Sequence, residues 1–178
     1  MDYYKDIKYI AQVDPEDHIL GKIERWEAHE KGILHRALTI AVFYQDYAIL
    51  QHRKHLVFDN VFDLTISSHQ LYEDTMQSDE EAIQQTLHRE LDLAIPDLEE
   101  QPLSHGSIVY QAKDPLSKYQ EHEVCHIYTC RTKTVPRINL DFAYGYSLQK
   151  MSDIVNHHSP LYTILAPWVK EMIREKKI

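Results

Sequence analysis

The chain has 178 residues, of which 43% are hydrophobic, so it is long enough to form one domain that buries roughly 70% of its unfolded surface. Its formal net charge of −9 argues against general binding to nucleic acids or anionic membranes, although a local basic pocket can still hold a small anion. The histidine count of 12 is high and makes a metal site worth seeking.

No segment approaches the roughly 18 consecutive apolar residues of a membrane-spanning helix, and the first residues contain no apolar run of the signal-peptide type. We therefore expect a cytoplasmic protein with a single domain over residues 1–178. Monomer is the default state, because the sequence is silent on oligomers. Cys125 and Cys130 lie on one predicted strand and point to opposite faces, so we expect both to be reduced core residues.

Eight β-rich or alternating runs predict strands, and most of them are separated by polar or proline-containing turns. In chain order they are residues 7–14, 18–24, 37–44, 48–53, 61–66, 107–112, 123–130 and 142–148. The predominance of strands indicates that a sheet forms the centre of the domain.

Two helices are predicted within and after this series of strands. The first begins at Ser78, which forms a capping box with Glu81, and its buried stripe is Ile83, Leu87 and Leu91. The second covers residues 160–176, and the apolar residues on one of its faces are Leu161, Leu165, Trp168 and Met172. The expected fold is of the α/β (α+β) class, with a mixed β-sheet packed between helices.

The segment EHEVCHIYTC, residues 121–130, begins a predicted strand with two carboxylates. Side chains alternate across a strand, so Glu121 and Glu123 point to the same face, roughly 7 Å apart. Two unpaired like charges at the edge of a core repel each other and are costly to desolvate. Either both carboxylates lie in open solvent or a cation lies between them.

Histidines elsewhere in the chain supply further candidate ligands. His29 and His35 bracket a glycine, and His69 directly follows a predicted strand. Each alone is more often an ordinary surface histidine. Together with the two glutamates they form an N3O2 set that suits Zn²⁺, Mn²⁺ or Mg²⁺, and imidazole favours the first two ions.

Glu90 places a carboxylate at the edge of the buried face of the first helix, three residues after Leu87. Helical spacing alone favours an edge residue that reaches water or forms an ion pair. The alternative is a ligand for a cation.

Four motifs spread over most of the chain carry a family resemblance. They are VDPEDHILGKIERWEAHEKGILHRA near the start, SSH in the middle, EHEVC later and PWVKEM near the end. With these motifs the chain resembles the type 1 isopentenyl-diphosphate Δ-isomerases, a branch of the Nudix superfamily. The resemblance implies a Nudix-type mixed sheet and a divalent metal bound by His29, His35, His69, Glu121 and Glu123.

The resemblance also implies roles for other residues. Glu90 matches a second Mg²⁺ site associated with the diphosphate, and Arg25 and Arg53 match basic residues that hold the diphosphate. Tyr110 matches an active-site tyrosine, and Trp168 matches a tryptophan whose aromatic face stabilises a carbocation. The implied partner is a small-molecule diphosphate, and the reaction interconverts isopentenyl and dimethylallyl diphosphate.

The reaction needs an acid and a base on opposite sides of a cation-like intermediate. The family uses a glutamate, which matches Glu123, and a cysteine, whose position here is Ser67. A thiol exchanges protons readily near neutrality, whereas a serine hydroxyl hardly ionises without an adjacent base. The expected outcome is a slow isomerase or a changed activity. Without the resemblance, Ser67 reads as a small polar residue at the end of a strand.

Other departures concern the diphosphate. A basic residue expected after Arg53 falls at an uncharged position near Val57, and Gln84 and Gln85 stand where the family has arginine. Weaker binding of a diphosphate is expected.

Two other functions remain open. A Nudix hydrolase places several helix glutamates on Mg²⁺ to activate water, but of the glutamates expected in its helix motif the segment 79–95 supplies only Glu90. A degenerate protein that binds metal and diphosphate without catalysis is the other alternative.

Overall fold

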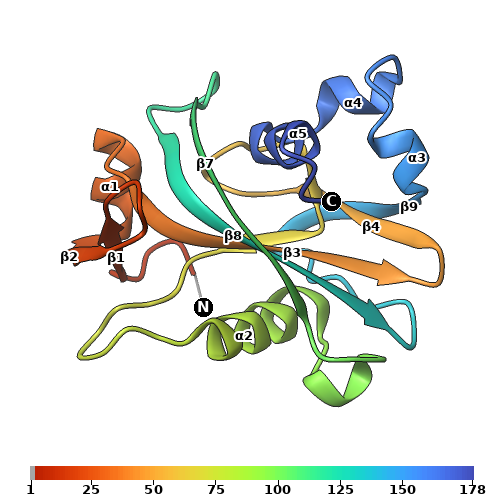
Figure 1. The fold of residues 1–178 in the computed structure, drawn as a ribbon, viewed down its shortest axis with the longest axis horizontal. Helices are drawn as coiled ribbons and strands as arrows, with labels where there is room; N and C mark the ends of the chain where they lie inside the picture. The colour runs from red at the N-terminus through yellow and green to blue at the C-terminus, as the bar shows by residue number, and fades with distance from the viewer. Residues whose placement is uncertain (1–2) are drawn as a thin grey trace.

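The computed structural model describes residues 3–178, and a single mixed β-sheet forms its centre (Figure 1). The strands of the sheet are β1 (Tyr9–Val13), β2 (Ile19–Glu24), β3 (His35–Tyr44), β4 (Tyr47–Arg53), β5 (Phe62–Leu64), β6 (Ile66–Ser68), β7 (Leu103–Lys113), β8 (Gln120–Thr132) and β9 (Ala143–Gln149). All eight predicted strands are present, and the one predicted at 61–66 is divided into β5 and β6 at Thr65.

Helices cover both faces of this sheet, as Figure 1 shows. They are α1 (Arg25–Lys31), α2 (Asp79–Leu91), α3 (Met151–Ile154), α4 (Pro160–Ile164) and α5 (Pro167–Arg174), with a 3-10 turn η1 at Ile95–Asp97. Helix α2 packs on one face and α5 on the other, and each covers its own hydrophobic cluster. The α+β class and the packing of the sheet between helices are as predicted.

Helix α2 forms where the sequence predicts it. Ser78 accepts a hydrogen bond from the backbone N–H of Glu81, and the Glu81 side chain accepts from the backbone N–H of Ser78. Ile83, Leu87 and Leu91 are buried against the sheet. The capping box and the apolar stripe therefore fix both the start and the orientation of this helix.

The prediction of one helix over 160–176 is wrong, because two helices occupy this segment. Leu165 and Ala166 have extended backbone conformations between α4 and α5. Pro167 follows them, and a proline disfavours helical geometry in the residue before it. The sequence analysis also missed α1 and α3, which have seven and four residues and are too short for a clear helical period.

The pairing of β3 with β8 positions much of the candidate site. These two strands run parallel, and His35 lies opposite Glu123 at the first of ten consecutive pairs. On its other side, β8 pairs antiparallel with β7, which places Tyr110 opposite Glu123. Residues distant in sequence therefore become neighbours across three adjacent strands.

Alternation along β8 separates its side chains into two sets. Cys125 packs in the cluster under α5, whereas Cys130 packs in the cluster under α2. Both cysteines are buried and unpaired with each other, as predicted. Within residues 3–178, no helix is long and apolar enough to cross a membrane.

Candidate functional site

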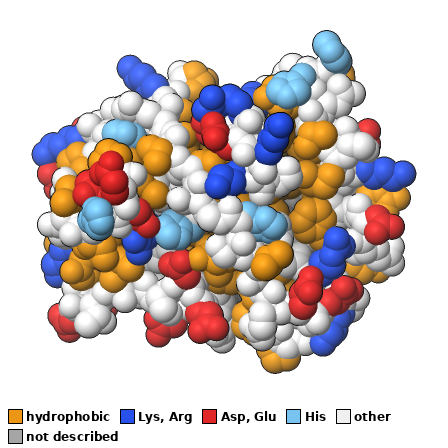
Figure 2. All heavy atoms as spheres, in the orientation of Figure 1, with side chains coloured by type: hydrophobic (Ala, Val, Ile, Leu, Met, Phe, Trp, Pro, Cys, Tyr) orange, Lys and Arg blue, Asp and Glu red, His pale blue; other side chains and the backbone are white. Residues whose placement is uncertain are grey.

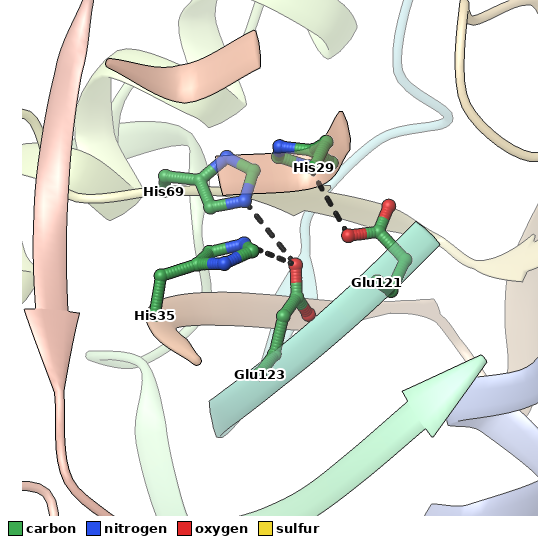
Figure 3. Close-up of side chains that lie close together, drawn as sticks. All are labelled: His29, His35, His69, Glu121 and Glu123. Atoms are coloured by element: carbon green, nitrogen blue, oxygen red, sulfur yellow. Dashed lines mark hydrogen bonds and ion pairs between the residues drawn. The ribbon is translucent and has the colours of Figure 1, made fainter. Parts of the chain in front are cut away.

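Five side chains converge at one end of the β3–β8 pair (Figure 3). They come from α1, from the first residue of β3, from the segment after β6 and from β8, and they are His29, His35, His69, Glu121 and Glu123. One potential ligand atom from each lies within 4.8 Å of all the others. The structure thus brings together the five residues that the sequence analysis grouped.

The contacts inside this cluster join imidazole nitrogens to carboxylate oxygens. His29 Nε2 lies 3.1 Å from Glu121 Oε2, and Glu123 Oε1 lies 3.2 Å from His69 Nε2 and 3.5 Å from His35 Nε2. All except His69 are buried. His35 Nε2 and Glu121 Oε2 are buried, and their contacts with Glu123 and His29 are charge contacts rather than hydrogen bonds, so neither atom has a hydrogen-bond partner among the described residues. Buried polar atoms without partners are costly, and a cation between them satisfies both.

Backbone carbonyls orient two of the histidines. His29 Nδ1 lies 2.7 Å from the carbonyl oxygen of Arg25, and His35 Nδ1 lies 2.7 Å from that of Ile33. Because a carbonyl oxygen only accepts, Nδ1 is the donor in both rings. In the neutral ring, Nε2 then carries the lone pair that points into the cluster, which is the usual arrangement of a histidine that binds a metal.

The charges of the cluster balance one another. Burial raises the pKa of Glu123, but its close contact with the His35 imidazole outweighs this effect, so the net pKa is lowered. Burial lowers the pKa of His29, but attraction to Glu121 outweighs it, so the net pKa is raised. Burial, followed by repulsion from the other two histidines, holds the pKa of His69 well below its ordinary value. The protein therefore keeps the Glu123 carboxylate charged and the His69 imidazole neutral, which are the forms that bind a metal ion.

Tyr110 completes the surroundings of Glu123. Its hydroxyl donates a hydrogen bond to Glu123 Oε2 at 2.5 Å, while Oε1 faces the histidines. Burial, and then repulsion by Glu123, raises the pKa of Tyr110 well above its ordinary value. The phenol thus stays protonated and acts as a donor to Glu123.

Ser67 lies on the wall of the same cavity as Glu123. Its Oγ lies 2.8 Å from Oγ1 of Thr39, which lies opposite it in the β3–β6 pair. Thr39 Oγ1 in turn lies 3.3 Å from Cys125 Sγ. Neither cysteine of the chain lines this cavity among the described residues. Ser67 is therefore on the cavity wall, where the described residues place no cysteine, and its match to the expected thiol stays a prediction.

Arg53 and Trp168 share a carboxylate. Arg53 Nη1 donates to Asp63 Oδ2 at 2.9 Å, and Trp168 Nε1 donates to Asp63 Oδ1 at 2.7 Å. The guanidinium carbon of Arg53 lies 4.9 Å from the centre of the Trp168 ring. Both residues, together with Arg25, line the cavity that contains the five-residue cluster.

Glu90 does not belong to the cluster. It is fully buried, but Oε2 accepts a hydrogen bond from Gln51 at 3.1 Å and Oε1 accepts one from Arg89 at 2.7 Å. This is the ion-pair alternative that the helical spacing favours. A Mg²⁺ role for Glu90 requires these partners to move, and it stays a prediction.

Among the residues on the cavity wall that sequence reasoning did not place at the site are Tyr3, Tyr4, His55 and Arg89. For two of them, the sequence contains a clue, because each is close to a residue that the sequence analysis had already singled out. Arg89 directly precedes Glu90, and His55 is two residues after Arg53. The two tyrosines come from the segment before β1, and no pattern in the sequence connects them with residues more than 50 positions away.

The surface outside the cavity shows no concentration of one charge on the face drawn in Figure 2, where acidic and basic side chains are interspersed.

Solved structures define the class of fold. A protein designated DR0079 from Deinococcus radiodurans matches 94% of this chain and 98% of its own length, with a TM-score of 0.71 and 16% identity. A MutT Nudix hydrolase from Burkholderia pseudomallei matches 79% of this chain and 96% of its own length, with a TM-score of 0.57 and 16% identity. The chain has the Nudix fold, as the sequence analysis predicted.

Sequence relatives narrow this class. No family model matches the chain. The isopentenyl-diphosphate Delta-isomerase of Pectobacterium atrosepticum is 31% identical over 149 residues, which cover 82% of this chain and 78% of the relative. The isopentenyl-diphosphate Delta-isomerase 2 of Photorhabdus laumondii is 27% identical over 167 residues, which cover 92% and 89%. The chain belongs to the isopentenyl-diphosphate Delta-isomerase family, and this membership supports a role as an enzyme.

Proposed function

We propose that this protein interconverts isopentenyl and dimethylallyl diphosphate, with a divalent metal held by the five-residue cluster. The observation that carries the proposal is a single cavity that contains this cluster, Ser67, Tyr110 and the arginines. Family membership and the unsatisfied atoms of His35 and Glu121 support it.

The residues fit the proposed metal. Three imidazole nitrogens and two carboxylate oxygens suit Zn²⁺ or Mn²⁺, and the bound ion supplies positive charge between Glu121 and Glu123. The preference of Mg²⁺ for oxygen ligands makes it a better match for a diphosphate than for this cluster.

The remaining chemistry falls to residues of the chain. The terminal methylene carbon of isopentenyl diphosphate has to gain a proton, and the carbon two bonds away has to lose one. Glu123 is proposed to carry one of these protons, because its carboxylate lines the cavity and receives a hydrogen bond from Tyr110. Trp168, fixed by its hydrogen bond to Asp63, presents an aromatic face that stabilises the cationic intermediate.

Ser67 is proposed to occupy the second proton-transfer position. Its hydroxyl has a hydroxyl partner, Thr39, and the described residues provide no carboxylate or imidazole in hydrogen-bond contact with it. A hydroxyl without an adjacent base is a poor acid and a poor nucleophile. Slow turnover is therefore expected.

A product assay tests the proposal directly. The purified protein is incubated with isopentenyl diphosphate in the presence of Mg²⁺ and Mn²⁺, and in parallel with a panel of nucleoside diphosphate compounds. Formation of the allylic isomer supports the isomerase. Release of phosphate or nucleotide instead supports a Nudix hydrolase, and metal binding without any product supports a degenerate binding protein.

Ser67→Cys sharpens this assay. If only the thiol is missing, the variant raises the rate of isomerisation by roughly 10² to 10⁴, the usual contribution of a positioned proton-transfer group. Ser147→Cys, in β9 and outside the lining of the cavity, is the matched control and leaves the rate near that of the parent. Absence of allylic product in both the parent and Ser67→Cys, with metal and diphosphate both bound, would contradict an isomerase mechanism.

A further inference from the structure

Three arginines and one histidine line the cavity that holds the five-residue cluster, namely Arg25, Arg53, Arg89 and His55. They come from α1, β4, α2 and the segment after β4. Only Arg25 and Arg53 match diphosphate-binding positions of the family. Arg89 and His55 do not match such positions. Two positions at which the family has basic residues, near Val57 and on α2, are uncharged in this chain.

Each of the three guanidinium groups is held against an aromatic ring. The distances from the guanidinium carbon to the ring centre are 4.4 Å for Arg25 on Trp26, 4.9 Å for Arg53 on Trp168 and 5.4 Å for Arg89 on Phe142. The ring of Tyr3 also lies 4.8 Å from Arg25 and 4.7 Å from Arg89. Stacking occupies the faces of a guanidinium and leaves the N–H groups at its edge free for phosphate oxygens.

Several donors of this group are unsatisfied. The Nε atoms of the three arginines and Nε2 of His55 are buried and have no hydrogen-bond partner within residues 3–178. Two carboxylates pair with two of the arginines, since Asp63 binds Arg53 and Glu90 binds Arg89. Arg25 Nη2 donates a hydrogen bond to the backbone carbonyl oxygen of Tyr3. Four buried donors with unmet hydrogen-bonding capacity on one cavity wall indicate an anionic ligand.

His55 lies in the electrostatic field of all three arginines. Burial, followed by repulsion from Arg53, Arg89 and Arg25, holds its pKa well below the ordinary value. The tyrosine ring of Tyr4 lies 5.8 Å from the imidazole, centre to centre. In the free protein the imidazole is therefore neutral and offers a hydrogen bond without adding a fourth positive charge.

We propose that Arg89 and His55 act together with Arg25 and Arg53 to bind the diphosphate group of the substrate. They supply the donors that the uncharged positions at Val57, Gln84 and Gln85 lack. This inference rests on the proposed function, because it assigns the substrate's diphosphate to the cavity beside the metal cluster.

The cavity itself is narrow, with a volume of about 60 Å³, which is room for only a few water molecules. Tyr3 and Tyr4 form part of its wall. Their rings have to shift when a diphosphate binds. Because Trp26 Nε1 donates to the carbonyl oxygen of Tyr4 at 3.0 Å, tryptophan fluorescence gives a second readout of binding.

Calorimetric titration with inorganic pyrophosphate tests the proposal without any turnover. His55→Leu and Arg89→Lys are expected to weaken pyrophosphate binding about 10- to 100-fold, because each loses one or more hydrogen bonds to a charged group. Arg89→Lys keeps the positive charge beside Glu90 and so protects the fold. The double variant Arg89→Gln/Glu90→Gln removes the ion pair as a unit and is expected to have a similar effect.

Arg131→Gln is the matched control, because it removes one exposed positive charge outside the cavity and leaves pyrophosphate binding unchanged. Thermal unfolding and Mn²⁺ binding are measured for every variant to show that fold and cluster are intact. Absence of pyrophosphate binding in the parent, or equal affinity in all folded variants, would overturn the proposal.

The substrate assay separates this inference from the proposed function. If pyrophosphate binding depends on His55 and Arg89 but no allylic product forms, the diphosphate site stands and the isomerase assignment fails. If product forms and KM for isopentenyl diphosphate is the same in the parent, His55→Leu and Arg89→Lys, the isomerase stands and the diphosphate role of these residues fails.

Discussion

Two groups of histidines and carboxylates lie on opposite faces of β8, and they differ in how their polar atoms are satisfied. On one face is the five-residue cluster, in which His35 Nε2 and Glu121 Oε2 have no hydrogen-bond partner among the described residues. On the other face His126 lies between two carboxylates, with Nε2 2.8 Å from Asp17 Oδ2 and Nδ1 3.4 Å from Asp79 Oδ2. We call this second group the His126 network.

In the His126 network, the imidazole and both carboxylates have hydrogen-bond partners. Arg36 donates to both carboxylate oxygens of Asp17, and Asp79 receives hydrogen bonds from Gln70 and Tyr128. Its histidine and both its carboxylates are partly exposed to solvent. Similar residue types thus form a structural hydrogen-bond network on one face and a candidate ligand site on the other. Unmet hydrogen-bonding capacity in a buried position, rather than residue type, distinguishes the two.

The largest expected effect is that of Glu123→Gln, which removes the proposed proton-transfer group and a proposed metal ligand together. Isomerisation is expected to be lost in both the parent and the Ser67→Cys background, since two required functions disappear. His126→Gln, three residues further along the same strand, is the control and keeps its activity. The measurement is the product assay, and activity retained in Glu123→Gln would remove this residue from the chemistry.

Metal binding should distinguish the two faces by stability. At a free Mn²⁺ or Zn²⁺ concentration about 1,000 times Kd, binding stabilises the fold by about 4 kcal/mol, which raises Tm by roughly 10 °C in a domain of this size. The shift is expected in the parent and in His126→Gln, and it is expected to shrink in His29→Gln. Elemental analysis that finds no metal, with no shift in Tm in the parent, would contradict the metal centre.

A smaller effect is expected from Asp79→Asn in the His126 network. The change weakens the hydrogen bonds with His126 and Tyr128, and the partial exposure of these groups limits the cost to about 1 kcal/mol. Urea unfolding measures this loss, and the m-value should stay the same. The affinity for Mn²⁺ is expected to be unchanged, and a large drop in affinity would show that the two faces are coupled.

The smallest effect concerns pH. Hydrogen bonding to Asp79, and then to Asp17, outweighs burial and raises the pKa of His126. The stability that it contributes is therefore fully present below about pH 6.5 and is lost as pH rises through the raised pKa. Hydrogen bonding to His126 lowers the pKa of Asp79, so its contribution is present above about pH 4 and is lost in stronger acid. Urea unfolding from pH 4 to 9 should show this decline at high pH in the parent and lose it in His126→Gln.

The sequence predicted what short-range patterns determine. Strand alternation placed Glu121 and Glu123 on one face, and the capping box located the start of α2 at Ser78. The family resemblance then connected these glutamates with histidines up to 94 positions away in sequence, which no local pattern does. The parallel pairing of His35 with Glu123 is the physical basis of that connection.

Other features depend on packing and had no clear signal in the sequence. Seven residues are too few to give α1 a helical period, although its last turn holds His29. For Glu90, helical spacing favoured an edge residue or an ion pair and the family resemblance implied a metal ligand. Only the positions of Gln51 and Arg89 show which partners it has. The closure of the cavity by Tyr3 depends on contacts that form only in the folded chain.

The pairing of His35 with Glu123 is also the terminal pair of the β3–β8 ladder. Ladder ends fray more readily than ladder centres, so amides there exchange with solvent sooner. The proposed ion would be bound by side chains from both strands, and it would connect this end of the ladder to α1 and to the segment after β6. Amide protection at the beginning of β3 and β8 therefore reports on ion occupancy independently of any substrate, and the loss of the ion loosens the end of the sheet before it affects its centre.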